Sequence, residues 1–385
     1  MKAFFDSLKN VMKAGKTNID SEVFKLHYKV TFMILMAASL LVTGREYFGD
    51  AITCIPPGEE YMQKIVDTYC WIHATFTLPG AMGKKVGSEV AHPGVEKYTP
   101  DRERVYHKYY QWVCFVLFLQ AVTFYAPRYL WKVWEAGKLG QLSGALDSPL
   151  QSASSAETRG GQVQRLAQYV WSTRRTHDAY LMQYVGCEVL NLVNVVVQIY
   201  LMDVFLGGAF SSFGLDVLRH SEKDPEERTD PMIRIFPRMT KCTFHFYGSS
   251  GDVQRYDTLC ILPLNVLNEK IFVLLWFWFM LLALLTAASL TARSAVLLSP
   301  RLRSFLLTRR ARLSDRFLVR RLVADLSPAD SFLLTQLAKN VDPLTFRDLV
   351  VELSRLDKSD GEADRNGNAQ PLLSHSLPPD SHSAV

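Results

Sequence analysis

The chain has 385 residues, of which 48% are hydrophobic, 12% aromatic and only 21% charged. A typical soluble domain carries about 25% charged residues, and here the charges fall mostly outside a few long apolar stretches. This composition excludes a disordered, collagen-like or coiled-coil chain and argues against a soluble enzyme. Six cysteines are too few for a small disulfide-stapled domain. We therefore predict a membrane protein.

Four stretches approach the roughly 20 apolar residues that a helix needs to cross a bilayer. They are residues 30–44, 109–127, 179–202 and 271–292. The third stretch contains one charged residue, Glu188. The first is the shortest, so we expect His27, Tyr28 and Lys29 to complete it at the membrane interface.

The distribution of lysine and arginine predicts the orientation of these spans, because cytoplasmic segments carry an excess of both. Residues 293–321 hold nine arginines against one acid, Asp315, and the first 29 residues hold six lysines against three acids. The segments between the first and second spans and between the third and fourth are balanced in charge. Both termini and the middle loop are therefore predicted to be cytoplasmic, with two large loops outside. We find no cleavable signal peptide.

The cysteines agree with this topology. Cys54 and Cys70 fall in the first outer loop, and Cys242 and Cys260 fall in the second. Disulfides form outside the cell and not in the cytoplasm, so we expect these four to be bonded. Four cysteines allow three pairings, and only bridges between the loops would join them into one platform.

The start of the second span carries a family resemblance. Tyr109, Tyr110, Gln111, Trp112 and Val113 resemble the YYQWV signature of innexins, the invertebrate gap-junction family. Further similar segments are 125–131, 236–245, 259–265 and 268–279. The resemblance implies a four-helix subunit that forms a ring around a pore, an octamer by preference. Such a ring would dock end to end with a channel of the neighbouring cell, as a homo-oligomer or with other innexins.

The resemblance also implies a nested disulfide pairing, Cys54 to Cys260 and Cys70 to Cys242. This pairing joins the cysteine nearest the first span to the one nearest the fourth. Pairing within each loop, and crossed pairing between the loops, are the two alternatives.

The predicted fold is therefore an all-α membrane protein with four transmembrane helices, two disulfide-bonded extracellular loops, a helical cytoplasmic layer and an oligomeric pore. The transmembrane helices are predicted at 25–44, 109–127, 179–206 and 267–292, and the extracellular loops at 45–108 and 207–266. The cytoplasmic parts are an N-terminal segment 1–24, a loop 128–178, a basic and helical region 293–357 and a disordered tail 358–385.

The N-terminal segment has the pattern of a short amphipathic helix. Phe4, Phe5 and Leu8 share one face, whereas Lys2 and other polar residues lie opposite. Such a helix can lie on the inner leaflet, but the resemblance favours a funnel in the pore mouth, lined by these four residues. Glu46 and Asp50, at the outer end of the first span, are further candidates for the pore wall.

Two features of the spans leave alternatives open. Aromatic residues stand at both ends of the second span, as is typical of aromatic belts at membrane interfaces. They are the tyrosines and Trp112 of the YYQWV motif at one end, and Trp131 and Trp134 at the other. Pro127 either ends the second helix or kinks it.

The third span carries a polar stripe of Glu188, Asn191, Asn194 and Gln198. Polar groups inside a membrane usually face protein or water. Hydrogen bonding between helices is the favoured interpretation, and a water-lined surface is the alternative.

The C-terminal region contains two helix-start signals, at Ser327–Asp330 and at Asp342–Pro343, which predict helices over 328–340 and 343–356. The basic stretch 301–321 is a solvated anchor or a site for anionic lipid or calmodulin. Residues from Lys358 onward have the composition of a disordered segment. The chain ends in Ser383, Ala384 and Val385, a pattern compatible with binding to a PDZ domain.

No motif of an enzyme, a metal site or a nucleotide-binding loop is found, and neither a cofactor nor nucleic acid is expected as a partner. The main rival function is an undocked hemichannel in the plasma membrane, as in pannexins. A four-span adhesion scaffold of the tetraspanin type fits less well, because no adjacent cysteine pair is present in the outer loops.

Overall fold

The computed structural model describes residues 17–56, 62–97, 99, 102–144, 155–221 and 231–365. These residues form two compact units. The first contains residues 20–134 and 185–292, and the second contains 17–19, 135–184 and 293–365.

Among the described residues, four helical segments are long and apolar enough to cross a membrane, which confirms the predicted number of spans. They are Glu22–Phe48, Tyr109–Glu135, Asp178–Phe205 and Pro263–Leu298. The first consists of α2 (Glu22–Lys25), the π-helix η1 (Leu26–Thr31) and α3 (Phe32–Phe48). The second consists of the 3₁₀ turn η4 (Tyr109–Trp112) and α5 (Val113–Glu135), and the last two are α8 (Asp178–Phe205) and α11 (Pro263–Leu298).

The first span begins earlier than its apolar stretch because its polar residues have partners inside the bundle. His27 and Tyr28, which we expected at the interface, are buried. The His27 Nε2 atom lies 2.8 Å from Thr286 Oγ1 of α11, and the Tyr28 hydroxyl donates to Asp20 over 2.8 Å. Thr31 donates to the Leu26 carbonyl within the π-helix, so the irregular turn keeps a hydrogen-bond partner.

The second span continues through Pro127, so the proline does not end the helix. Arg128, directly after the proline, pairs with Asp20 at 2.8 Å, and Trp131 one turn later is fully buried. Trp131 therefore packs inside the protein and is not part of an interfacial belt, whereas Trp134 is 40% exposed. Tertiary contacts in the turn after Pro127 offset the missing backbone donor.

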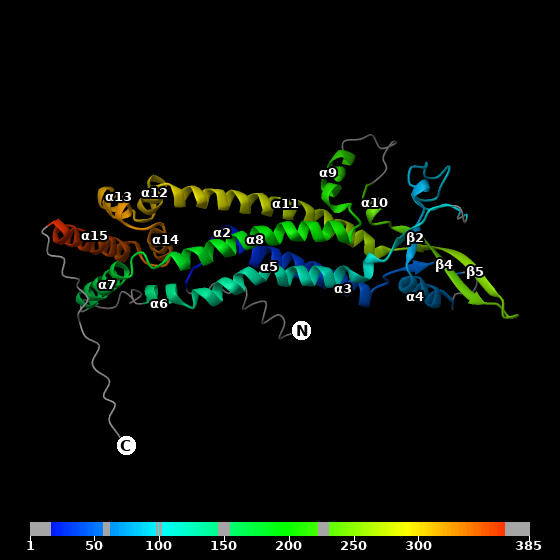
Figure 1. Cartoon of the computed structure of the whole chain (residues 1–385). Coiled ribbons are helices and arrows are strands. Elements are labelled where there is room, and N and C mark those ends of the chain that lie inside the picture. Colours follow the sequence, from blue (N-terminus) through cyan, green and yellow to red (C-terminus); the bar gives the residue numbers. More distant parts are fainter. Residues whose placement is uncertain are drawn as a thin grey trace, which may run out of the picture. The chain divides into compact units, whose positions relative to one another are not determined.

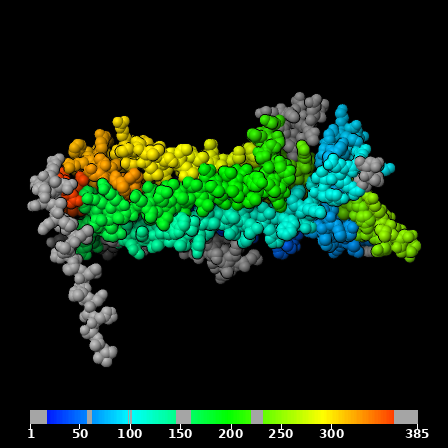
Figure 2. All heavy atoms as spheres, viewed as in Figure 1, coloured from blue at the N-terminus to red at the C-terminus, as the bar shows by residue number. Residues whose placement is uncertain are grey.

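The four spans pack side by side as a bundle in the first unit (Figure 1). Fully buried apolar residues from all four helices meet in its core: Leu35, Leu117, Phe124, Val195, Phe272 and Phe279. On the face shown in Figure 2, α8 lies between α5 and α11. Exposed side chains of α8 are apolar, with Val193, Val196 and Tyr200 at least half exposed. A surface of this kind suits contact with lipid or another subunit.

The two outer loops form a five-stranded antiparallel sheet in the described residues, which the sequence analysis did not predict. The strand order is β1-β5-β4-β2-β3. The strands are β1 (Thr53–Cys54), β2 (Thr75–Thr77), β3 (Val105–His107), β4 (Met239–Tyr247) and β5 (Val253–Ile261). The loops also contain α4 (Gln63–His73), the 3₁₀ turn η3 (Pro79–Ala81), α9 (Phe210–Ser221) and α10 (Pro231–Ile235).

The second unit is helical. Its helices are α6 (Lys138–Gly144), α7 (Ser155–Ser172), α12 (Pro300–Arg310), α13 (Arg316–Asp325), α14 (Pro328–Leu337) and α15 (Pro343–Arg365). The last two begin at the prolines that mark their predicted starts. However, α15 extends past residue 356 into the segment predicted to be disordered. Asp360 explains the extension, because it accepts a hydrogen bond from Trp171 Nε1 at 2.8 Å and pairs with Arg174 at 3.0 Å.

Helix α9 rests on α11 through a glycine. A Cβ atom at Gly214 would collide with the indole ring of Trp276, whose Nε1 donates to the Ser211 carbonyl over 3.2 Å. We expect Gly214→Ala to lower the free energy of unfolding by about 1–3 kcal/mol, as overpacking does. Thermal unfolding of the purified protein measures this. Gly186→Ala in α8, with nothing within 4 Å of the added atom, is the control, and an equal loss in both variants would contradict the packing argument.

Candidate functional site

The two outer loops are joined by two disulfides. Cys54 of β1 is bonded to Cys260 of β5, its direct partner in the strand register, and Cys70 of α4 is bonded to Cys242 of β4. These are the bridges of the nested pairing. They close chain segments of 206 and 172 residues. Three of the sulfur atoms lie within 4.8 Å of one another, but all are in disulfides and none is a thiolate that could bind a metal.

The sheet β1–β5, helix α4 and the two disulfides together form a unit that we call the outer platform. All four bonded cysteines are buried in its core with Val66, Phe244 and Leu262. Strands of the first loop flank the β4–β5 hairpin of the second loop on both sides. Neither loop could therefore form this sheet alone.

The YYQWV motif fastens the second span to the outer platform. Tyr110 is fully buried in the platform core, with its ring centroid 4.6 Å from that of Trp71 in α4. Gln111 Nε2 donates a hydrogen bond to the Trp71 carbonyl. Trp112 is 60% exposed. The aromatic-belt interpretation therefore suits Trp112 but is wrong for Tyr110.

The two remaining motif residues face the spans. The Tyr109 ring lies 5.6 Å from Phe236 of the second loop and 6.4 Å from Phe205 at the end of α8. Val113 is fully buried in the bundle core. The five residues of the motif thus contact the outer platform, Phe236 of the second loop and the core of the bundle.

An ion pair around a buried carboxylate connects the platform to the fourth span. Arg238, next to β4, donates to Glu269 Oε2 from Nε at 3.1 Å and from Nη2 at 2.9 Å. Lys270 binds the other carboxylate oxygen at 2.7 Å, and Glu269 is fully buried. Two donors on one guanidinium fix orientation as well as distance. The hairpin root is therefore held in a defined direction on α11.

The far end of the β4–β5 hairpin carries exposed aromatic and apolar side chains. Tyr247 is 75% exposed, Val253 63% and Tyr256 42%. The turn between the strands closes through a hydrogen bond from the Gly248 amide to the Asp252 carbonyl at 2.9 Å. Figure 1 shows this end of the hairpin projecting from the sheet. Exposed tyrosines on a rigid support are typical of protein interaction surfaces.

The predicted pore residues are only partly within the described chain. Lys2, Phe4, Phe5 and Leu8 lie outside the described residues. Glu46 is half-buried at the end of α3, and Asp50 is exposed.

The chain enters the bundle at Asp20. This carboxylate forms an ion pair with Arg128 at 2.8 Å and accepts a hydrogen bond from the Tyr28 hydroxyl. The Arg128 guanidinium also lies 5.2 Å from the centroid of the Tyr28 ring. Burial raises the pKa of Asp20, although Arg128 opposes this shift. The three side chains hold the start of the first span against the second span.

The polar stripe of the third span faces protein. Gln198 Nε2 donates to Thr123 Oγ1 of α5 at 2.9 Å, and the Ser21 hydroxyl donates to Glu188 at 3.2 Å. Asn191 is 2% exposed, whereas Asn194 is half-buried and lies 3.4 Å from the Gln198 amide nitrogen. These contacts support the packing interpretation.

In the second unit, one carboxylate connects two segments. Asp330 of α14 accepts hydrogen bonds from His177 Nδ1 at 2.8 Å, the Arg175 amide at 2.9 Å and the Ser327 hydroxyl at 2.8 Å. Burial would raise the pKa of Asp330, but these hydrogen bonds outweigh it and hold the pKa below its usual value. The predicted N-cap Ser327 accepts from the Asp330 amide, so the helix start and the loop before α8 share one anchor.

Comparison with known proteins adds an independent observation. The family model described as Innexin matches residues 20–356. "Innexin inx2" of Schistocerca americana is 51% identical over 311 residues, covering 80% of this chain and 85% of the relative. "Innexin inx2" of Drosophila melanogaster is 49% identical, with 81% and 84% covered, and "Innexin shaking-B" of the same species is 47% identical, with 80% and 82% covered.

Removing one bridge should loosen the outer platform. We expect Cys70→Ser with Cys242→Ser to lower the free energy of unfolding by about 2–5 kcal/mol, the usual cost of losing a native disulfide. Limited proteolysis of the loops and thermal unfolding measure the change. Cys114→Ser with Cys187→Ser is the control, since both thiols are buried and unbonded to each other; if it loosened the loops equally, the bridge would not be the cause.

The anchor at Asp330 should give a pH-dependent difference. Asp330→Asn removes the charge and replaces one of the two acceptor oxygens by an amide donor, which should cost about 1–3 kcal/mol at neutral pH because part of the donors lose their acceptor. A carboxylate with a depressed pKa stabilises the fold above its unfolded-state pKa, and this contribution is lost as pH falls through the folded-state pKa. Hydrogen exchange of α14 measures the free energy of opening. The difference in this free energy between wild type and variant should therefore become smaller below about pH 4. The half-exposed Asp348→Asn should show no such gap, and a gap that widened in acid would contradict the argument.

Proposed function

Since this chain belongs to the innexin family, the subunits of invertebrate gap junctions, we propose that it forms a ring around a large pore that docks with a ring in the adjacent cell. Ions and small solutes would pass between the two cytoplasms. The outer platform is the observation that carries the proposal, because it makes one ordered surface from two loops. Ordering mobile side chains on contact costs roughly 0.5–1.5 kcal/mol for each, and a surface that is already ordered avoids this cost.

The docking contact is proposed to involve the far end of the β4–β5 hairpin. Tyr247 and Val253 are exposed there, on strands held by both disulfides and by the Arg238–Glu269 pair. Burying such residues against a partner is favourable because aromatic anchors supply much of the energy of an interface.

The ring is proposed to be an octamer, as a homo-oligomer or with other innexins. The exposed apolar faces of the spans, α8 among them, would contact neighbouring subunits and lipid. Lys2, Phe4, Phe5 and Leu8 are proposed to form a funnel at the inner pore mouth, with Glu46 and Asp50 nearer the outer end. A water-filled path of this kind needs no catalytic group or cofactor, since width and wall charge set its selectivity.

The channel is proposed to lie in the plasma membrane at gap junctions, with both termini in the cytoplasm. The excess of arginine after the fourth span supports this orientation. The basic stretch 301–321 is a candidate for calmodulin binding, and Ser383 and Val385 are candidates for recognition by a PDZ domain.

Dye transfer tests the proposal. Paired cells expressing the chain should exchange a small fluorescent dye, whereas uptake by single cells alone would indicate an undocked hemichannel. Tyr247→Ser with Val253→Ser should reduce transfer by about tenfold or more, because losing an anchor of an interface costs at least that much, while surface expression stays unchanged.

The chain offers a matched control for this test. Val105→Ser with Tyr106→Ser changes the same residue types on β3, where they are also exposed, 43% and 53%, but on an edge strand of the sheet and not on the hairpin. Transfer should persist in this control. Equal loss in both double variants would show that the hairpin end is not the contact.

A further inference from the structure

The second unit contains a large basic cavity formed by α12, α13 and the segment between them. Its volume is about 1030 Å³, at the upper end of the range of about 300–1,000 Å³ for small-molecule sites. We call it the α12–α13 cavity. Five arginines line it: Arg301, Arg309, Arg312, Arg316 and Arg320.

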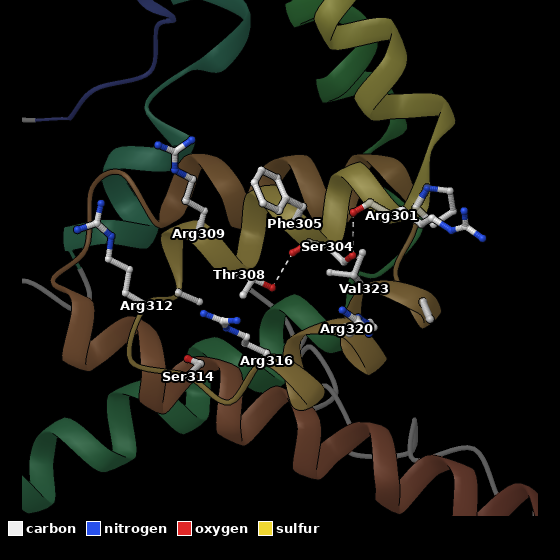
Figure 3. A pocket seen from close by; sticks show the side chains of 13 residues that line it. Arg301, Ser304, Phe305, Thr308, Arg309, Arg312, Ser314, Arg316, Arg320 and Val323 are labelled. Atoms are coloured by element: carbon white, nitrogen blue, oxygen red, sulfur yellow. Dashed lines mark hydrogen bonds between the residues drawn. The ribbon is translucent and has the colours of Figure 1, made fainter.

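The arginines come from both helices. Arg316 and Arg320 are one turn apart on α13, and Figure 3 shows both reaching toward Ser304 and Thr308 of α12. Arg309 and Arg312 lie at the rim in the same view, with their guanidinium groups directed away from Ser304 and Thr308. The Thr308 and Ser304 hydroxyls donate to backbone carbonyls of α12 at 2.7 and 2.9 Å. The guanidinium groups are therefore the main donors available to a ligand.

The positive charge of the cavity is not balanced by the described part of the chain. None of its five arginines forms an ion pair with an acid among the described residues. Asp315, the one acid in residues 300–324, accepts the Phe317 amide and so caps α13. In contrast, Arg321, which does not line the cavity, is paired with Asp357 at 3.4 Å. Like charges one helical turn apart repel, so a bound anion would stabilise the arrangement.

One further lining group is unsatisfied. The Ser314 hydroxyl oxygen is buried and has no hydrogen-bond partner in the structure. Buried polar groups are nearly always paired, and leaving one unpaired is costly. A ligand oxygen in the cavity would supply the missing partner.

The density of guanidinium groups indicates the class of ligand. Arginine binds phosphate through two parallel hydrogen bonds, and clusters of arginine select ligands with several phosphate groups. A small ring that bears several phosphates matches five arginines within one cavity better than an extended acidic peptide does. The chain enters α12 at Pro300, two residues after α11 ends at Leu298. Because α12 begins so close to the end of the fourth span, a lipid headgroup can supply this chemistry as well as a soluble ligand.

We propose that the α12–α13 cavity binds an inositol polyphosphate, either as a free solute or as the headgroup of a phosphoinositide lipid. This site is separate from the outer platform and does not depend on docking between cells.

Titration calorimetry on the purified full-length protein in detergent tests the proposal. One arm uses inositol hexakisphosphate, and the other uses dioctanoyl phosphatidylinositol 4,5-bisphosphate with dioctanoyl phosphatidylserine for comparison. Arg316→Gln with Arg320→Gln should weaken binding by about tenfold or more, since each bidentate charged contact is strong. A second double variant, Arg309→Gln with Arg312→Gln at the rim, should also weaken binding. It replaces the first variant in the test if that one does not assemble.

The matched control is Arg310→Gln with Arg347→Gln, which removes the same charge from exposed positions outside the cavity. It should leave the affinity within about twofold of wild type. Tighter binding of the lipid than of the soluble ligand would assign the site to the headgroup, and the reverse would assign it to the free solute. Binding of neither ligand, or equal weakening in control and cavity variants, would overturn the proposal.

Discussion

The insertion of the β4–β5 hairpin between strands of the first outer loop is the constraint on which the rest of the first unit depends. β5 pairs with β1 on one side, and β4 pairs with β2 on the other. Both disulfides lie toward the root of the hairpin, where Cys260 faces Thr240 and Cys242 faces Thr258, and they link each of its strands to the first loop. The outer ends of the spans therefore meet one rigid body and not two independent loops. Tyr110 and Glu269 extend this rigidity into the second and fourth helices.

Within the bundle, polar pairs give the spans their specificity. Lipid tails are as apolar as leucine, so apolar contact alone does not decide which helix faces which. The structure instead has a hydrogen bond at several crossings: Ser39 to the Cys114 carbonyl, Gln198 to Thr123, and Trp278 to Thr31. Each contributes only about 0.6–2 kcal/mol. Together they define the neighbours and the rotation of the helices.

The spans, the cysteine arrangement and the helix starts at Pro328 and Pro343 could be predicted because each follows from a local signal. A long uncharged stretch is visible in the sequence, and so is a serine followed by proline and an acid. The sheet could not be predicted, because β1 has two residues and β2 and β3 have three each. Strands so short exist only through their partners on the other loop. For the same reason the sequence did not reveal that Tyr110 is buried: its environment is built by residues far away in the chain.

Two helix ends that local composition did not fix have a shared cause. The sequence left open whether the second helix ends at Pro127, and it placed the end of the last helix at residue 356, whereas α5 continues to Glu135 and α15 to Arg365. In both cases a tertiary partner holds the extra turns, Asp20 for Arg128 and Trp171 for Asp360. Propensity is a weak guide wherever such contacts form.

The order of the strands also has a consequence for biosynthesis. The central hairpin is translated after the first three spans, but it must lie between strands that were delivered to the outer side much earlier. Contacts of such long sequence separation form slowly. A chain with only three spans inserted would present unpaired strand edges together with the free thiols of Cys54 and Cys70. In the oxidising lumen such thiols are reactive, and they lack their native partners until Cys242 and Cys260 have been translocated.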